Sequence, residues 1–314
     1  MIVLLLKLCL FAKCGLVNSF TTPSAVRIQQ RGGKIRTTAS KRVTGGGISN
    51  DSVALSMFNF GSGNSKGSVA SIPKSNNERD NQAIDAIKAA IKKKPSGKSI
   101  PLIECEFPPL GALNKLGDGS LRSTLEAEDA NIAFASKLVK GLAPFPFGPK
   151  INVFMSSAAS NSYVTKAKTK IKGGQVLPLK GGVDEEVLSE KDICVMVTPS
   201  TRSDYQIAEK LASSGQVFAV IIVNAFAKDQ KSIPSSATMG YFLKPLTYNS
   251  QIAGFLIRSY PSEWTVLDAF SKEVLGTFTD DEIRVKNTNT PDLRQSGKLV
   301  QSSVDQRAIR ARQL

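Results

Sequence analysis

The clearest indication of the fold comes from two stretches, DICVMVTPS at residues 192–200 and VFAVIIVNAF at residues 217–226. Each contains a continuous apolar run that ends in a valine, Val197 or Val223. Runs of this kind are typical of strands that are buried on both faces of a parallel sheet. Residues 204–214 between them have a helical pattern that closes at Gly215. The order strand, helix, strand predicts a right-handed βαβ unit in which the two runs are neighbouring central strands.

The same alternation extends toward the N-terminus. We expect strands at 100–107, 151–155 and 175–179, and helices at 77–94, 122–142 and 163–171, with Asn77 as the N-cap of the first helix. After Gly240 the pattern changes to strands without helices between them, at 241–243, 252–259, 265–270 and 274–279, which predicts antiparallel pairing. The predicted fold class is therefore α/β: a Rossmann-like, mainly parallel sheet flanked by helices, with antiparallel strands at the C-terminal side.

The composition divides the 314 residues into a leader, a linker, a domain and a tail. We predict a signal peptide at 1–19, a transit peptide at 20–56, a disordered linker at 57–77, a single α/β domain at 78–283 and a disordered basic tail at 284–314. No run of about 18 apolar residues follows the leader, so we expect no transmembrane segment in the mature chain.

The leader combines an apolar start with a basic continuation. Residues 1–11 have the length of a signal-peptide core, and 21–50 contain no acidic residue. With the junction Asn18-Ser19-Phe20 between them, the leader resembles the bipartite plastid presequence of diatoms and related algae. That resemblance implies that Phe20 is the import determinant. The alternative is a plain secretory signal followed by a disordered basic segment.

Charge and residue usage exclude several classes of site. Of the formal net charge of +15, much lies in the leader and the tail, so the domain is only mildly basic and we expect no nucleic-acid partner. The chain has no histidine, and its four cysteines include no CxxC pair. We therefore expect no metal site, no disulfide framework, no cofactor and no assignable catalytic residue.

A ligand site in such a sheet is expected outside the carboxyl ends of the strands. The loops at 156–162 and 198–204 are rich in hydroxyl groups and open into helices, where free N–H groups bind anions. One hypothesis is an anionic ligand, a phosphate or nucleotide, held by Ser157, Asn161, Ser200, Thr201, Arg202 and Asn224. The alternative is that these side chains are helix caps and turn formers. Neither GxGxxG nor GxxxxGK[ST] occurs.

Three further features permit two interpretations each. Lys166, Lys168, Lys170 and Lys172 form either a solvated helix face or a basic patch that contacts anionic thylakoid lipid or an acidic partner. The shared strand face of Glu104 and Glu106 permits acid–base chemistry, but a structural role is the alternative. Trp264, the only tryptophan, is expected in the core or else as an interaction anchor.

A series of landmarks over about residues 80–280 resembles a known family. They are AIDAIKAAIKKK at 83–94, LIECEFPPLGA at 102–112, a Gly-Asp-Gly turn at 117–119, the two apolar stretches, and GFLIRSYPSEWTVL at 254–267. Their order and residue types resemble the plastid and cyanobacterial domain-of-unknown-function family nineteen-ninety-five, which includes the low photosystem II accumulation proteins of plants. This chain has Asn224-Ala225-Phe226 where many members have Asn-Pro and an aromatic residue.

The resemblance implies a Rossmann-like fold, a plastid location and, for the plant members, help in building photosystem II. The family supplies no established catalytic residue. The first functional expectation is thus a non-enzymatic protein of the stroma, or peripheral to the thylakoid, whose partners are thylakoid or photosystem assembly proteins. The alternative is a phosphate- or nucleotide-binding enzyme of the plastid stroma.

Overall fold

The computed structural model describes residues 70–93, 99–108, 124–143, 148–184, 186, 188–225, 234, 236–285 and 288–313. The predicted signal and transit peptides, including Phe20, lie outside these residues. The helices are α1 (Asn76–Lys92), α3 (Thr124–Leu142), α4 (Asn161–Lys170), α5 (Arg202–Ser214), α6 (Asp280–Val285) and α7 (Leu293–Gln313). The strands are β1 (Leu102–Glu106), β2 (Ile151–Met155), β3 (Gln175–Pro178), β4 (Ile193–Val197), β5 (Ala219–Val223), β6 (Thr238–Tyr248), β7 (Gln251–Ser259), β8 (Trp264–Asp268) and β9 (Val274–Phe278).

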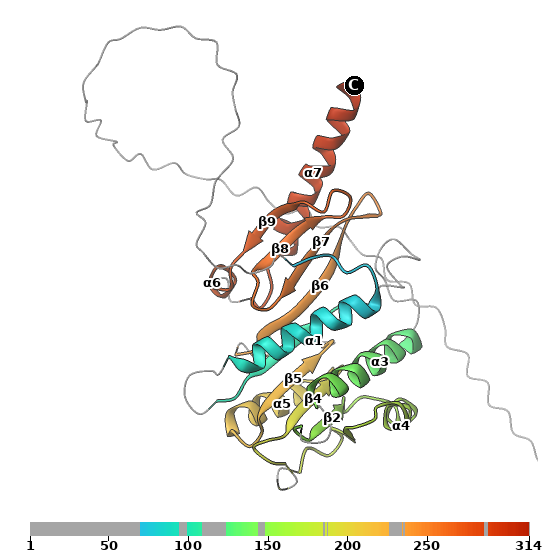
Figure 1. The fold of residues 1–314 in the computed structure, drawn as a ribbon, viewed down its shortest axis with the longest axis vertical. Helices are drawn as coiled ribbons and strands as arrows, with labels where there is room; N and C mark the ends of the chain where they lie inside the picture. Colours follow the sequence, from blue (N-terminus) through green and yellow to red (C-terminus); the bar gives the residue numbers. More distant parts are fainter. Residues whose placement is uncertain are drawn as a thin grey trace, which may run out of the picture. The chain divides into compact units, whose positions relative to one another are not determined.

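Within the described residues, nine strands form one sheet in the order β3-β2-β4-β5-β1-β6-β7-β8-β9 (Figure 1). The strands from β3 to β6 in this order pair in parallel, and β6 to β9 pair antiparallel. The two apolar runs are neighbours, with Val197 opposite Val223. The predicted fold class is confirmed, including the antiparallel strands at the C-terminal side.

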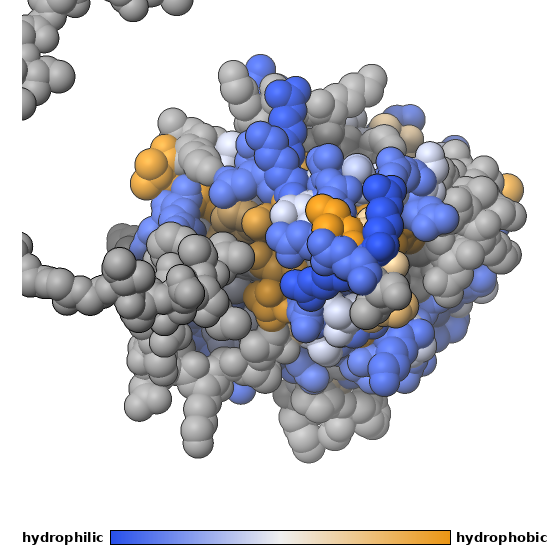
Figure 2. Space-filling view, turned by 90° about the horizontal axis from the view of Figure 1, so that it is seen from above, coloured by the Kyte–Doolittle hydropathy of each residue, from blue (hydrophilic) through white to orange (hydrophobic). Residues whose placement is uncertain are grey.

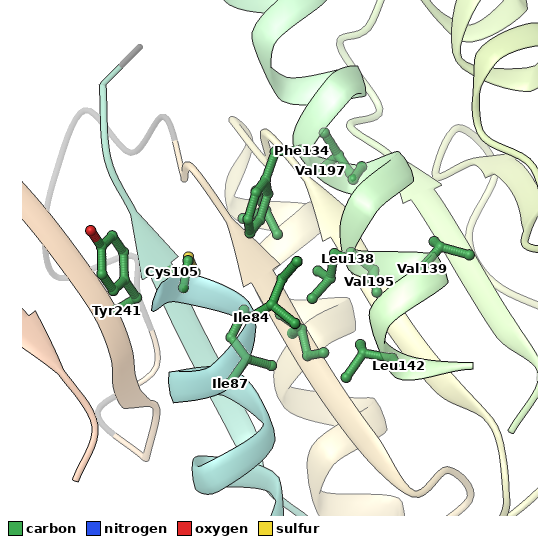
Figure 3. Packing of buried hydrophobic residues seen from close by; sticks show 14 of the residues in the cluster. Ile84, Ile87, Cys105, Phe134, Leu138, Val139, Leu142, Val195, Val197 and Tyr241 are labelled. Carbon is green, nitrogen blue, oxygen red and sulfur yellow. The ribbon is translucent and has the colours of Figure 1, made fainter. Parts of the chain in front are cut away.

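Every residue of β4 and β5 is buried, and successive side chains of a strand point to opposite faces of the sheet. Both faces of the parallel strands are therefore covered by helices. On one face α1, α3 and α4 contribute to the main hydrophobic core. Figure 3 shows Ile84 and Ile87 of α1 and Leu138 of α3 packed near Val195. On the other face α5 packs against the alternate side chains of the same strands.

The first helix begins slightly earlier than predicted. Its N-cap is Ser75, whose hydroxyl accepts a hydrogen bond from the Glu78 N–H at 3.2 Å, rather than Asn77. The end of the predicted linker also packs on the domain, because Ala70 is buried and the Gln82 amide donates to the Ser71 carbonyl. The helix starts earlier because Ser75 supplies the N-cap hydroxyl, and the linker end packs on the domain because Ala70 and Pro73 are buried.

The prediction of a disordered tail over 284–314 is wrong, because helix α7 forms there. The helix is mostly polar, but Ser296 and Val300 on one side of it are buried. Val300 packs with Leu256 and Trp264 of the antiparallel strands. The helix approaches this sheet closely because two of the facing strand positions, Gly254 and Gly276, have no side chain.

The close approach of α7 generates a stability prediction. A Cβ atom at Gly254 would lie 2.8 Å from the Leu267 carbonyl oxygen and would overlap the side chain of Val300. We therefore expect Gly254→Ala to lower the free energy of unfolding by about 1–3 kcal/mol, measured by denaturant titration.

Gly297→Ala is the matched control, because a Cβ atom there meets nothing within 4 Å. It lies on α7 itself and should leave stability unchanged or raise it by up to about 1 kcal/mol. Equal stabilities for Gly254→Ala and the unsubstituted chain would contradict the docking of α7 on this sheet.

Candidate functional site

The carboxyl ends of β2 and β4 bring the two hydroxyl-rich loops into contact. β2 pairs with β4, with Met155 opposite Val197, so the residues that follow each strand lie side by side. The Ser156 and Ser200 hydroxyl oxygens are 2.9 Å apart, and those of Ser157 and Thr201 are 3.0 Å apart. Three of the predicted site residues, Ser157, Ser200 and Thr201, therefore meet as the sequence suggested.

The centre of this cluster is the carboxylate of Asp204, which is fully buried at the start of α5. It accepts hydrogen bonds from the Ser156 hydroxyl at 2.8 Å and from the backbone N–H groups of Ser157 at 3.2 Å and Ser200 at 3.1 Å. Thr201 completes a capping box with it. Burial raises the pKa of Asp204, but the hydrogen bonds outweigh burial and the net shift of its pKa is downward.

The arrangement favours the interpretation of these residues as caps and turn formers. The hydroxyl and N–H groups that would hold an anion already donate to Asp204 or bond to one another. An anion at the same place would meet a buried negative charge. Sequence reasoning did not assign the role of Asp204, although Thr201 followed three residues later by an acid is the pattern of a capping box.

Asn161 and Arg202, the other two predicted residues of these loops, stay outside the network. Arg202 is the exposed first residue of α5. Asn161 is the exposed first residue of α4, whose N-cap is instead Ser160, with its hydroxyl 3.2 Å from the Tyr163 nitrogen.

The sixth predicted residue, Asn224, joins β5 to β1 and to α3. Its backbone N–H donates to the Cys105 carbonyl at 2.7 Å, and its side-chain oxygen accepts from the Phe107 N–H at 2.8 Å. Its side-chain nitrogen donates to Asn131 of α3 at 2.6 Å. Asn224 adopts φ 47°, a left-handed conformation that asparagine tolerates better than most residues. The side chain thus fastens the end of β1 to β5 and α3.

A buried arginine on the α1 side of this edge was not predicted. The Arg79 guanidinium lies 4.3 Å from the centre of the Phe107 ring and donates to the Pro108 carbonyl at 3.0 Å. Its charge is balanced by Asp80, whose other oxygen accepts from Lys137 at 2.6 Å. Arg79 therefore positions the chain as it leaves β1, and only the three-dimensional structure identifies it, because its sequence context is an ordinary helix start.

Glu104 and Glu106 lie on the α5 side of β1. Glu104 is buried, and no hydrogen bond reaches its Oε1 atom from the described residues. Burial, with a smaller contribution from Glu106, raises the pKa of Glu104 to about 8, so the group is mostly protonated at neutral pH. Burial also raises the pKa of Glu106, opposed by the positive charge of Lys244.

The remaining sequence features divide between surface and core. Lys166 and Lys170 of α4 form ion pairs with Asp129 of α3 at 2.7 and 3.3 Å, while Lys168 and Lys172 are exposed. Half of the predicted lysine patch is therefore paired with a neighbouring helix. Trp264 is 1% exposed and donates to Asp280 at 3.2 Å, which confirms the core assignment.

Two kinds of feature are absent from the described residues. They contain no group of three or more His, Cys, Asp and Glu side chains that could hold a metal ion. Among the described helices, none has the length and apolar character needed to cross a membrane.

Comparison with known proteins places the chain by one match. A family model described as "Domain of unknown function (DUF1995)" matches residues 73–280, more than half of the 314-residue chain. No curated protein and no solved structure matches the chain.

The raised pKa of Glu104 generates a pH prediction. The folded chain holds a proton on Glu104 up to about pH 8, whereas the unfolded chain releases it near the usual 4.5. Stability should therefore fall as pH rises from about 5 to about 9, and Glu104→Gln should remove this part of the fall, on the order of a few kcal/mol. Urea unfolding at several pH values measures it.

Glu190→Gln, at an exposed position, is the control for removing one carboxylate. It should show the same pH dependence as the unsubstituted chain. If Glu104→Gln also follows the unsubstituted chain at every pH, Glu104 is not a buried, protonated acid.

Proposed function

Because this chain belongs to the family defined by the domain of unknown function DUF1995, we propose that it is a non-enzymatic plastid protein that assists the assembly or accumulation of a photosystem in the thylakoid. The match over residues 73–280 carries this proposal, since it covers α1 and all nine strands of the described sheet. The proposed partners are thylakoid or photosystem assembly proteins.

The polar residues at the carboxyl ends of the strands support a non-catalytic role. Ser157, Ser200 and Thr201 are engaged in the network around Asp204, and Asn224 fastens three elements together. Side chains with these tasks maintain the fold rather than receive a substrate. A protein of this kind acts through its outer surface, as assembly factors do when they hold a partner.

The leader supports a plastid location. We propose that residues 1–19 direct the chain to the secretory route and that Phe20, with the acid-free basic segment behind it, directs import into the plastid. The mature chain would then reside in the stroma, free or peripherally attached to the thylakoid.

Deletion of the gene in a diatom tests location and role together. We expect photosystem accumulation, measured by immunoblot and by chlorophyll fluorescence, to fall severalfold and to recover when the full chain is reintroduced. The Phe20→Ala chain should not reach the plastid and should not restore accumulation. Phe60→Ala in the predicted linker is the matched control and should restore it. Normal photosystem levels in a clean deletion would contradict the proposal.

The stromal enzyme with a phosphate or nucleotide ligand is the alternative, and one observation favours it. Arg202 is exposed at the N-terminus of α5, next to the hydroxyl-rich loops, where it could pair with a phosphate. A thermal-shift panel of nucleotides and sugar phosphates distinguishes the two functions. The assembly proposal predicts no response. A ligand-induced rise in melting temperature that Arg202→Ala removes and Arg294→Ala leaves intact would contradict the assembly proposal and favour the enzyme.

A further inference from the structure

A pocket of about 430 Å³ lies where α7 crosses the antiparallel strands. The β6–β7 turn, the β8–β9 turn and α7 enclose it. Its lining is made of Tyr248, Asn249, Gln251, Ile252, Ala253, Ala269, Phe270, Val304 and Arg307. The lining includes the apolar side chains of Ile252 and Val304 and the aromatic rings of Tyr248 and Phe270. A cavity of this size accommodates a large side chain of a partner, or a short stretch of peptide.

The pocket is held in shape by polar contacts behind it. The buried carboxylate of Asp268 accepts hydrogen bonds from the Phe270 N–H at 2.7 Å and the Ser303 hydroxyl at 2.8 Å, and it pairs with Arg307. The Tyr248 hydroxyl donates to Asp305 at 3.1 Å. These contacts join both turns to α7, so the pocket exists before any partner arrives, which lowers the entropic cost of binding.

An exposed aromatic side chain marks the rim. Phe270 is 83% exposed, although the core of this half of the domain is close by. The Arg307 guanidinium lies 5.6 Å from the centre of the Phe270 ring. Figure 2, which looks at the domain from above the view of Figure 1, shows orange hydrophobic groups bordered by blue hydrophilic residues. An exposed aromatic ring beside a pocket is a common anchor in protein interfaces.

Positive charge continues from the pocket along the end of α7. Residues 306–313 contain three arginines and no acidic residue. Arg307 is balanced by Asp268, but Arg310 and Arg312 are exposed and form no ion pair within the described part of the chain. Guanidinium groups bind carboxylates through paired hydrogen bonds, so this end of the helix is complementary to an acidic chain.

We propose that this pocket binds an acidic segment of a partner protein, which inserts an aromatic or aliphatic side chain beside Phe270 and places a carboxylate against Arg310, one helical turn beyond Arg307. The site goes beyond the proposed function, because it requires no role in photosystem assembly.

The observations favour a peptide over an anionic membrane surface. The pocket is concave, whereas a bilayer offers a broad, uniformly charged face. Asp305 is exposed beside Tyr248 and would be repelled by such a face. A peptide can direct a carboxylate to Arg310 and keep its other charges away from Asp305.

Fluorescence anisotropy tests the site with the full chain and a fluorescein-labelled peptide that has one central phenylalanine flanked by glutamates. We expect saturable binding that Phe270→Ala weakens by at least about tenfold. The double charge reversal Arg310→Glu/Arg312→Glu should weaken it to a similar degree. All these positions are exposed, so the unfolding midpoints should stay unchanged.

Two matched controls separate the site from general effects. Phe218→Ala removes another exposed phenylalanine, and Arg294→Glu/Lys298→Glu reverses two charges at the other end of α7. Both should bind as tightly as the unsubstituted chain. Equal losses in test and control variants, or no saturable binding up to about 1 mM, would overturn the proposal. Binding to phosphatidylglycerol vesicles without binding to the peptide would overturn it in favour of a membrane-contact surface.

Discussion

The pairing of β4 with β5 at the centre of the sheet is the constraint on which the rest of the domain depends. Residue faces residue from Ile193 and Ala219 to Val197 and Val223, and every side chain of both strands is buried. This register makes the two strands end at the same level. The loops that follow them, and the loop after β2, must therefore share one edge of the sheet, where their backbone groups need partners.

Asp204 supplies three of those partners, because its carboxylate accepts hydrogen bonds from the N–H groups of Ser157, Ser200 and Thr201. A buried carboxylate is stable only if several donors surround it, and the serine-rich loops provide them. Asn224 serves the next junction in the same way, with both ends of its amide in use. The polar groups around Asp204 and Asn224 are thus directed inward, whereas Phe270 and Arg310, which belong to the proposed partner site, are exposed at the antiparallel end.

Much of this could be predicted from local patterns. The apolar runs gave the central strands, and their order gave the parallel sheet, because burial on both faces leaves a clear signal in the sequence. The meeting of Ser157 with Thr201 followed from the same reasoning. The role of Asp204 did not, because an acid early in a helix has the same pattern whether it faces solvent or a second loop. The sequence did not reveal helix α7, because Val300 is its one buried apolar residue among those described. The strand position that Val300 packs against, Gly254, is also far away in the sequence.

The stability of an Asp204→Asn chain measures how strongly this carboxylate holds the two loops together. We expect the free energy of unfolding to fall by about 2–5 kcal/mol and hydrogen exchange at the Ser157 and Ser200 amides to become faster. Asp85→Asn, at an exposed position on α1, should change neither quantity. If the Asp204→Asn chain is as stable as the unsubstituted one and those amides stay protected, the loops do not depend on the Asp204 carboxylate.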